Sequence, residues 1–330
     1  MGLGCIPNDS PSFIGMVGMH GSYAANVAMN EADVVIAAGV RFDDRATGLV
    51  SKFCPEAKII HIDVDAAEVD KILDSTVAVV ADVESVFPVI AQLVAEKNIK
   101  ADAAWLKKIQ KLKEENASLN CGRPKGEKLA NPRELISKIP EYAAYSGLNQ
   151  DNLIVTTDVG QHQMWAAQYY PVDRPRSFLT SGSLGTMGFG LPAAIGAAIA
   201  NEDKRVICIS GDGSIMMNIQ ELATLAELNL PVTVILFVNG TLGMVYQQQK
   251  YLFEKNYSAS VFTKNPDFTA LAKSFGIEAV DADTDPEWYK KAFDANRSNK
   301  PCFVKVSVDS EENVLPFVPG GRANIDAIRN

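Results

Sequence analysis

The chain has 330 residues, of which 47% are apolar and 22% are charged, and its formal net charge is −9. This composition predicts a globular protein of two domains; the negative charge argues against nucleic-acid binding, and no apolar run reaches the roughly 18 to 20 residues that cross a bilayer. The five cysteines include no C-x-x-C pair, which favours a reducing compartment and predicts a cytoplasmic protein.

The first 98 residues alternate apolar runs with helical segments. Predicted strands lie at 33–39, 58–65 and 77–80, and a predicted helix at 83–97 follows the third strand. This alternation predicts a parallel α/β layer. Residues 99–130 are rich in Lys, Glu and Asn, which predicts a solvated helix and a linker between domains.

Residues 131–330 predict a second parallel α/β block. The block begins with Asn131-Pro132, which places proline at the first position of a helix. Predicted strands lie at 152–158, 176–181, 205–210, 231–238, 278–282 and 302–308. Predicted helices lie at 187–201, 218–229, 267–275 and 286–296. About 200 residues suffice for one well-buried core.

The most informative passage of this block consists of two strands joined by a helical stretch. The first strand ends in Gly211-Asp212-Gly213-Ser214, and the next ends in Asn239. Parallel strands joined by one helix bring both side chains to the carboxyl edge of a sheet, where ligands bind. A carboxylate, an amide oxygen and a nearby backbone carbonyl suit Mg²⁺ that also holds phosphates, and glycines before a helix accommodate a phosphate. The alternative interpretation is a helix-capping aspartate and a turn asparagine.

Further polar or glycine-rich segments also follow predicted strands. In Thr157–Gln163, the lone His162 is more often structural than ligand-binding, and in 181–190 Met187 is either core filler or a soft wedge against a ligand ring. In the first block, Gly18-Met19-His20-Gly21 and the segment 39–45 suggest a second nucleotide site. The alternative for 39–45 is a surface cluster of ion pairs.

Together these segments resemble the thiamine-diphosphate enzymes, and specifically the large catalytic subunit of acetolactate (acetohydroxyacid) synthase. The resemblance covers nearly the whole chain. Besides the Asp212/Asn239 pair, it is carried by Gly18–Gly21, Arg41–Arg45, Gly160–Trp165, the glycine-rich turn around Met187, Leu242–Val245, Asn265–Phe268 and Asn313–Pro316. It implies an α/β fold in which a parallel-sheet, three-layer thiamine-diphosphate-binding domain follows part of a second, FAD-binding central domain. The expected boundaries are 1–98 for the partial central domain, 99–130 for the linker and 131–330 for the C-terminal diphosphate and magnesium domain.

The resemblance also implies roles for individual residues. Asp212, Asn239 and the carbonyl of Thr241 would ligate Mg²⁺. Gly185 would accept a hydrogen bond from the aminopyrimidine of thiamine diphosphate, and Met187 would hold the bent cofactor beneath its thiazolium. The remaining residues expected around thiamine diphosphate are Val159, Gly160, Gln161, His162, Gly211, Gly213, Ser214, Gly243, Met244 and Val245. The residues expected around FAD are Gly18, Met19, His20, Gly39, Val40, Arg41, Phe42, Asp43, Asp63 and Val64.

The activity implied is that of a thiamine-diphosphate-dependent transferase of branched-chain amino acid biosynthesis. It would condense two pyruvates to 2-acetolactate with loss of carbon dioxide, or pyruvate with 2-ketobutyrate to 2-aceto-2-hydroxybutyrate. The family's N-terminal pyrimidine-binding domain, with its activating Glu, is expected to lie outside this chain, so no catalytic residue is assigned here. We therefore expect a homodimer or a complementing chain, and the resemblance also admits a regulatory small subunit.

Two positions depart from the family pattern. Val238 stands where the family usually has the first Asn of an Asn-Asn pair, and Gln248 stands where a Trp helps to select 2-ketobutyrate, which leaves that preference open. The alternative functions are another thiamine-diphosphate enzyme, such as a glyoxylate carboligase or a pyruvate oxidase, and a non-catalytic cofactor-binding fragment.

Overall fold

The computed structural model describes residues 2–118 and 129–329, so Cys121 and residues 119–128 of the expected linker lie outside the described residues. The chain divides into two compact units. Unit 1 comprises Met1–Phe13 and Gly122–Val314, and unit 2 comprises Ile14–Cys121 and Leu315–Asn330. This division differs from the expected boundaries, because each unit includes a short segment from one end of the chain.

Unit 1 contains a six-stranded, wholly parallel sheet in the order β5-β4-β6-β7-β9-β8. Its strands are β4 Leu153–Thr157, β5 Phe178–Thr180, β6 Arg205–Gly211, β7 Val232–Val238, β8 Glu278–Asp281 and β9 Cys302–Ser307. Each of these lies within or beside a predicted strand, since the buried strands of a parallel sheet are continuous apolar runs. The predicted parallel α/β fold is confirmed.

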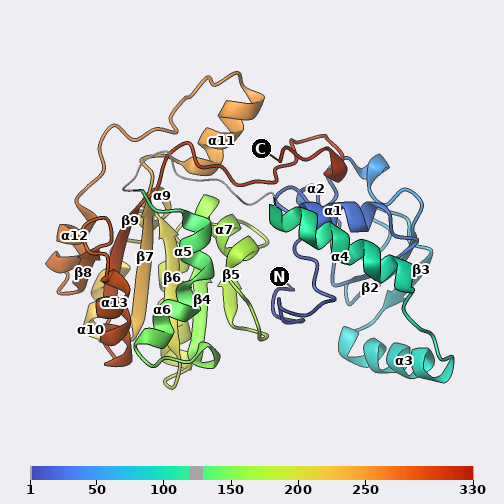
Figure 1. Cartoon of the computed structure of the whole chain (residues 1–330), viewed down its shortest axis with the longest axis horizontal. Coiled ribbons are helices and arrows are strands. Elements are labelled where there is room, and N and C mark those ends of the chain that lie inside the picture. The colour runs from blue at the N-terminus through green and yellow to red at the C-terminus, as the bar shows by residue number, and fades with distance from the viewer. Residues whose placement is uncertain (1, 119–128, 330) are drawn as a thin grey trace. The chain divides into compact units, whose positions relative to one another are not determined.

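Helices cover both faces of this sheet. Figure 1 shows α5, α6 and α13 on the face toward the viewer. The helices of unit 1 are α5 Pro132–Ser137, α6 Ile139–Tyr145, α7 Gln161–Tyr169, α8 Gly190–Ala200, α9 Asp212–Ile215, α10 Glu221–Glu227, α11 Gly243–Leu252, α12 Phe268–Ser274 and α13 Trp288–Arg297. A 3-10 turn, η2, spans Gln150–Asn152. As predicted, α5 begins after the cap Asn131 with Pro132 in its first turn.

The two faces of the sheet have separate hydrophobic cores because side chains alternate along each strand. On β6, Ile207 and Ile209 pack with α5, α6, α7 and α13, whereas Val206 and Cys208 pack with α8, α10 and α12. All four of these side chains are fully buried. The three layers hold the strand ends, and the loops that follow them, in fixed positions.

Unit 2 contains a three-stranded parallel sheet in the order β1-β2-β3. The strands are β1 Val34–Ala38, β2 Lys58–Asp63 and β3 Val77–Val80. The helices are α1 Tyr23–Asn30, α2 Asp44–Thr47, α3 Val83–Glu96 and α4 Ala103–Ser118, with 3-10 turns η1 Val50–Lys52 and η3 Asn324–Asp326. Although α4 falls in the expected linker, its Ile109 and Leu112 are buried against α1. No helix among the described residues is both long and apolar enough to cross a membrane.

Candidate functional site

Three adjacent strands of unit 1 end at one edge of the sheet, and most of the predicted cofactor residues follow them. β4 leads into Asp158 and α7, β6 leads into Asp212 at the start of α9, and β7 leads into Asn239. Because β4, β6 and β7 are neighbours in the sheet, the three segments lie side by side. The structure thus brings together residues that are more than 80 positions apart in the sequence, as the strand pattern predicted.

Asp212 is buried at this edge and is held by three donors. Its Oδ1 accepts a hydrogen bond from the Gly213 N–H at 3.0 Å. Its Oδ2 accepts hydrogen bonds from the Gly240 N–H and from Asn265 Nδ2, each at 2.8 Å. Burial raises the pKa of Asp212, and the donors oppose this effect. A buried carboxylate with a raised pKa gains from a cation beside it.

Asn239 and Thr241 lie in the loop that ends β7. Asn239 Oδ1 accepts a hydrogen bond from the Thr241 N–H at 3.0 Å, and Asn239 Nδ2 donates to Gln161 Oε1 at 3.2 Å. Thr241 Oγ1 is buried and has no partner in the described protein. A buried polar atom without a partner beside a carboxylate and an amide marks a place where a bound group would complete the hydrogen bonding.

The donor set at this edge suits Mg²⁺ rather than a thiolate-binding or imidazole-binding metal. Within residues 2–118 and 129–329, no group of three or more His, Cys, Asp and Glu side chains is arranged to hold a metal ion. The oxygens that lie at this edge are the Asp212 carboxylate, the Asn239 amide oxygen and nearby backbone carbonyls. Hard oxygen ligands from one or two side chains, completed by phosphate oxygens, are the usual environment of protein-bound Mg²⁺.

A group of three residues in contact with one another lies next to Asp212: His162, Ser214 and Gly211. Burial lowers the pKa of His162 to about 3, so the imidazole is neutral at physiological pH. The Ser214 hydroxyl lies 3.5 Å from His162 Nε2 and also contacts the Gly211 backbone. A Cβ on Gly211 would lie 2.7 Å from His162 Nδ1. Because residue 211 is a glycine, its backbone can lie close to the His162 ring. Gly160, which immediately precedes α7, also lies close to this ring.

Gly213 and Gly243 also stand where a side chain would not fit. A Cβ on Gly213 would lie 2.7 Å from Leu242 Cδ2, and a Cβ on Gly243 would overlap Gln161 Oε1. Gly213 belongs to α9, and Gly243 begins α11. Both glycines are therefore required by the packing of this chain's own side chains. Each also lies in the first turn of a helix, where N–H groups and the positive end of the helix dipole favour a phosphate group.

The glycine-rich turn at 181–190 is fixed by Asp158. Asp158 is fully buried, and its Oδ1 accepts hydrogen bonds from the Val159 N–H at 2.8 Å and the Gly188 N–H at 2.7 Å. Burial raises the pKa of this carboxyl. In the same turn Gly185 is exposed with a φ of +67°, and Met187 is half-buried. The sequence analysis named the Asp158 segment but did not identify this anchoring role.

The apolar residues predicted to line the thiamine pocket differ in burial. Met244 packs against the core, whereas Val245 is 44% exposed. Leu184 is 89% exposed, and Met217 is 55% exposed. Val245 lies on α11, whereas Leu184 and Met217 lie in the loops that follow β5 and α9.

In unit 2, the residues predicted to contact FAD gather at the carboxyl edge of the three-stranded sheet. Gly39 and Val40 follow β1, and Asp63 and Val64 lie at the end of β2. The Gly39 N–H donates to the Ile62 carbonyl at 2.9 Å, and a Cβ on Gly39 would meet no atom within 4 Å. At Gly39, the position of a side chain is therefore not filled by other protein atoms.

The predicted segments 18–20 and 41–45 meet at this edge. The Met19 N–H donates to the Arg45 carbonyl at 2.7 Å. Asp43 caps α2, and Arg41 lies 3.4 Å from it, so the expected alternative of a surface ion-pair cluster also has a basis in the structure. The Phe42 side chain packs against Phe53 and His61 in the core, which leaves only its backbone for a ligand.

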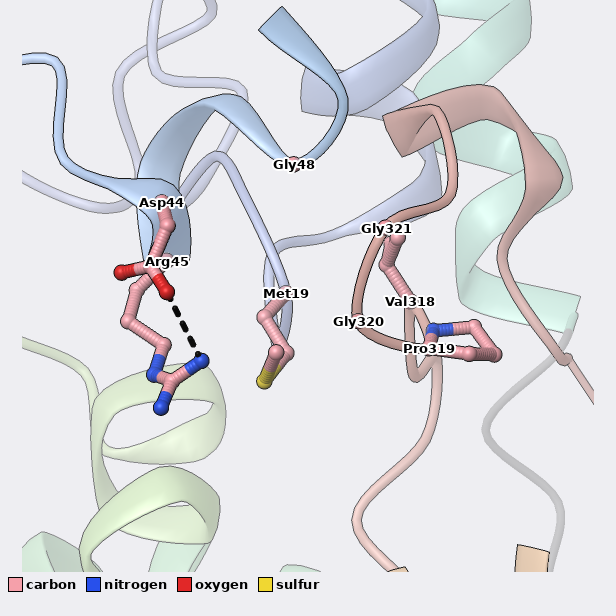
Figure 2. Close-up of a pocket in the computed structure, with 8 residues that line it drawn as sticks. All are labelled: Met19, Asp44, Arg45, Gly48, Val318, Pro319, Gly320 and Gly321. Atoms are coloured by element: carbon pink, nitrogen blue, oxygen red, sulfur yellow. Dashed lines mark hydrogen bonds and ion pairs between the residues drawn. The ribbon is translucent and has the colours of Figure 1, made fainter. Parts of the chain in front are cut away.

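A small cavity of about 50 Å³ lies beside Met19 in unit 2. Figure 2 shows the Met19 side chain between Arg45 and the 318–321 segment. The Val318 N–H donates to the Met19 carbonyl at 2.9 Å, and His20 stacks on Phe317. This contribution of residues 315–330 was not predicted, because nothing in their composition distinguishes them from the end of unit 1.

Two other neighbours of the site were also missed. Asn265 donates to Asp212, and Gln247 is buried on α11 against the backbone of Val314. Asn265 belongs to a segment that carried the family resemblance, so it could have been assigned from that signal. Gln247 directly precedes Gln248, whose position was compared with the family pattern, but no inward-facing role was assigned to it because Gln on a helix is usually solvated.

Comparison with known protein families matches both units. The model described as "Thiamine pyrophosphate enzyme, C-terminal TPP binding domain" matches residues 158–306. The model described as "Thiamine pyrophosphate enzyme, central domain" matches residues 1–93. The C-terminal match covers Asp158, Asp212 and Asn239, and the central match covers the segments around Met19 and Arg45.

Several curated proteins that this chain resembles are large subunits of acetolactate synthase. The isozyme 1 large subunit of Escherichia coli is 45% identical over 99% of this chain and 56% of the relative. The probable large subunit of Methanocaldococcus jannaschii is 43% identical over 98% of this chain and 54% of the relative, and the isozyme 2 large subunit of E. coli is 42% identical over 99% and 57%. The chain thus spans about half the length of the curated relatives that it matches.

Proposed function

Because this chain belongs to the thiamine pyrophosphate enzymes, whose central and C-terminal domains it carries, we propose that it is the cofactor-binding part of an acetolactate synthase large subunit. Its substrates are then pyruvate and a second 2-keto acid, and the product is 2-acetolactate or 2-aceto-2-hydroxybutyrate. The observation that carries this proposal is the grouping of Asp212, Asn239 and Thr241 at one glycine-lined sheet edge, within a domain matched as TPP-binding.

The proposed magnesium and diphosphate site uses residues of unit 1. Asp212, Asn239 Oδ1 and the Thr241 carbonyl would hold Mg²⁺, and Gln161, His162, Gly213 and Ser214 would line the diphosphate. The neutral His162 donates or accepts a hydrogen bond there without adding a charge. Thiamine diphosphate, when bound, supplies the carbanion chemistry by which a 2-keto acid is decarboxylated and joined to a second one. The protein orients this cofactor between Val159, Gly160, Gly185, Met187, Gly211, Gly243, Met244 and Val245.

We also propose that unit 2 binds FAD along the edge formed by Gly39, Val40, Asp63 and Val64. The open backbone at Gly39 and the cavity beside Met19 support this assignment. The other proposed contacts are Gly18, His20, Arg41, Phe42 and Asp43. Phe42 contributes through its backbone, because its side chain is in the core.

A complementing partner is proposed from the apolar surface of unit 2. Val34 and Ile36 on β1 are each 48% exposed, and α3 has no buried residue although it carries Phe87 and Leu93. An unpartnered apolar sheet face is unfavourable in water. We propose that it is covered by the polypeptide corresponding to the part of the relatives that this chain does not span, in the same subunit or as a separate chain. A second copy and a regulatory small subunit are further proposed partners.

The cell compartment proposed is the cytoplasm. Cys5, Cys54, Cys208 and Cys302 are free thiols in the structure, and the last two are buried in the core of unit 1. Free, inert thiols fit a reducing compartment. Fractionation of cells that express the chain tests this assignment, and recovery with an oxidising compartment contradicts it.

The activity is tested by reconstitution. The chain is mixed with a fragment covering the remaining N-terminal part of an acetolactate synthase large subunit, and pyruvate, Mg²⁺, thiamine diphosphate and FAD are added. Acetolactate formation supports the proposal, and Asp212→Ala in the same mixture is the matched control that abolishes it. Acetyl phosphate or acetate as product indicates a pyruvate oxidase, and a product formed only with glyoxylate indicates a carboligase. Cofactor binding without turnover indicates a non-catalytic fragment.

A further inference from the structure

We propose that Gln247 is a positioning residue that fixes the orientation of the proposed metal ligand Asn239, acting through Gln161. The three side chains form a chain of amide hydrogen bonds from the backbone of Val314 to the edge of the sheet, which we call the amide relay. This inference rests on the proposed Mg²⁺ site. It adds a residue, Gln247, that does not itself contact the metal or the cofactor.

The relay begins where the backbone of Val314 fixes the amide of Gln247. Gln247 is 1% exposed, and its Nε2 donates to the Val314 carbonyl at 3.0 Å. Its Oε1 accepts a hydrogen bond from the Val314 N–H at 2.7 Å. A backbone N–H is only a donor and a carbonyl is only an acceptor, so this pair admits one orientation of the amide.

The second step fixes Gln161. Its Nε2 donates both to Gln247 Oε1 at 3.1 Å and to the Glu312 carbonyl at 2.9 Å. Both partners are acceptors, so the Gln161 oxygen must face the other way, toward Asn239. Gly243 leaves room for this oxygen, because a Cβ there would overlap it.

The third step fixes Asn239. Its Nδ2 donates to Gln161 Oε1 at 3.2 Å, which turns its Oδ1 toward the Thr241 backbone. A carbonyl oxygen has two lone pairs, so Oδ1 can accept from the Thr241 N–H and still ligate a cation. If the amide were reversed, an NH₂ group would face the cation and repel it. The relay therefore determines which atom of Asn239 meets the metal.

The origin of the relay is itself anchored. Arg133 on α5 pairs with Glu312 at 2.8 Å and donates to the Asn313 carbonyl at 2.7 Å, and both charged side chains are buried. Residues 312–314 are thereby held against α5, so the Val314 backbone groups that bond Gln247 have a fixed position. Groups that orient a metal ligand typically change metal affinity by 10- to 100-fold when they are removed.

The relay is tested by titrating Mg²⁺ calorimetrically into the whole chain in the presence of thiamine diphosphate. Gln247→Met keeps the volume and removes both polar atoms, so the Kd for Mg²⁺ should rise by about 10-fold or more. The matched control is Asn296→Ala, which removes a buried amide bonded to Val206, Pro231 and Thr233 at the other end of the sheet. It should lower the melting temperature but leave the Kd for Mg²⁺ within about two-fold.

Gln247→Glu gives a readout that loss of packing alone would not. The protonated carboxyl offers one O–H donor and one acceptor, as the amide does. The ionised form has no donor for the Val314 carbonyl and is repelled by that oxygen, so the carboxylate moves away from Val314 and displaces the acceptor that fixes Gln161. The ratio of variant to wild-type Kd should therefore approach one as the pH falls from about 8 to about 5.5, where a buried carboxyl is protonated. A ratio that stays constant or grows as the pH falls would overturn the relay.

The outcomes separate this inference from the proposed function. If the wild-type chain binds no Mg²⁺ with thiamine diphosphate, the proposed function fails and the relay fails with it. If the wild type binds and Gln247→Met binds equally well, the relay is wrong while the proposed site stands. If Gln247→Met does not fold, the pH dependence of Gln247→Glu decides.

Discussion

At the scale of single residues, several glycines at the candidate site are required for space. A Cβ on Gly243 would overlap Gln161 Oε1 and would lie 2.9 Å from Asn239 Nδ2. Gly196 in α8 is the opposite case, because a Cβ there would meet no atom within 4 Å. The two positions therefore distinguish a glycine that a site needs from one that a helix merely tolerates.

We expect Gly243→Ala to push Gln161 away from Asn239 and to destabilise the fold by roughly 1–3 kcal/mol, as overpacking does. The displacement of Gln161 should also raise the Kd for Mg²⁺ measured in the presence of thiamine diphosphate. Gly196→Ala should instead stabilise the chain by roughly 0.5–1 kcal/mol, because Ala is the better helix former. Urea unfolding and calorimetry measure both effects. Equal behaviour of the two variants would show that the close approach at Gly243 is unimportant.

A second residue-scale prediction concerns His20. Burial, helped by the Arg45 guanidinium, lowers its pKa from 6.5 to about 4. The imidazole therefore takes up a proton near pH 6.5 in the unfolded chain but only near pH 4 in the folded chain. The free energy of unfolding is therefore highest above pH 6.5 and decreases as the pH falls from 6.5 to about 4. The loss amounts to roughly 3 kcal/mol at most. His20→Phe keeps a ring against Phe317 but removes the titrating group. Its urea midpoint should therefore fall less than that of the wild type between pH 7 and pH 4.5. An equal fall in the two proteins would contradict the assignment.

At the scale of elements, the buried pair Arg133–Glu312 joins α5 to the segment that follows β9. The two side chains are only 8% and 9% exposed. A buried ion pair gives little net stability relative to apolar residues, but removing one partner leaves an unpaired charge. The junction is therefore destabilised when one of the two charges is removed and the other remains.

We expect Glu312→Gln to destabilise unit 1 by roughly 3–5 kcal/mol. The double variant Arg133→Met with Glu312→Met should recover much of that loss, because no charge is left unpaired. A double-mutant cycle by urea unfolding measures the coupling, and additive effects would contradict it. Since Val314 follows this junction, Glu312→Gln should also raise the Kd for Mg²⁺.

The elements also show where prediction from the sequence succeeded and where it failed. Buried strands such as β6 and β7 are continuous apolar runs, so their ends, and hence the proximity of Asp212 and Asn239, were predictable. Helices α7 and α11 were not assigned, because Gln161 and Gln247 are polar residues that face inward and break the apolar periodicity. The amide relay was out of reach, since it needs Val314, which is 67 positions from Gln247.

At the scale of the whole molecule, unit 2 carries an apolar face that the described residues of this chain leave exposed. Val77 on β3 and Leu93 on α3 are 47% and 46% exposed. Elements with few buried contacts open readily and exchange their amide hydrogens quickly. We therefore expect fast exchange in α3 in the chain alone.

Adding the complementing fragment should slow exchange in β1, β3 and α3, while the core strands β6 and β7 stay equally protected. Hydrogen exchange followed by mass spectrometry measures both regions in one experiment. Protection that appears only in unit 1 would place the partner elsewhere and would contradict the proposed interface.

Residues 315–330 belong to unit 2 although they follow unit 1 in the sequence, and this order has a consequence for biosynthesis. Most of unit 2 is translated early, yet Phe317 and Val318, which contact His20 and Met19, and Asn324, which donates to the Ala46 carbonyl, are translated after all of unit 1. The contacts that these residues make with His20, Met19 and Ala46 can therefore form only after unit 1 has been synthesised. Until then the surface around His20 that Phe317 covers in the finished fold is exposed, and surface of this kind favours aggregation or binding by chaperones.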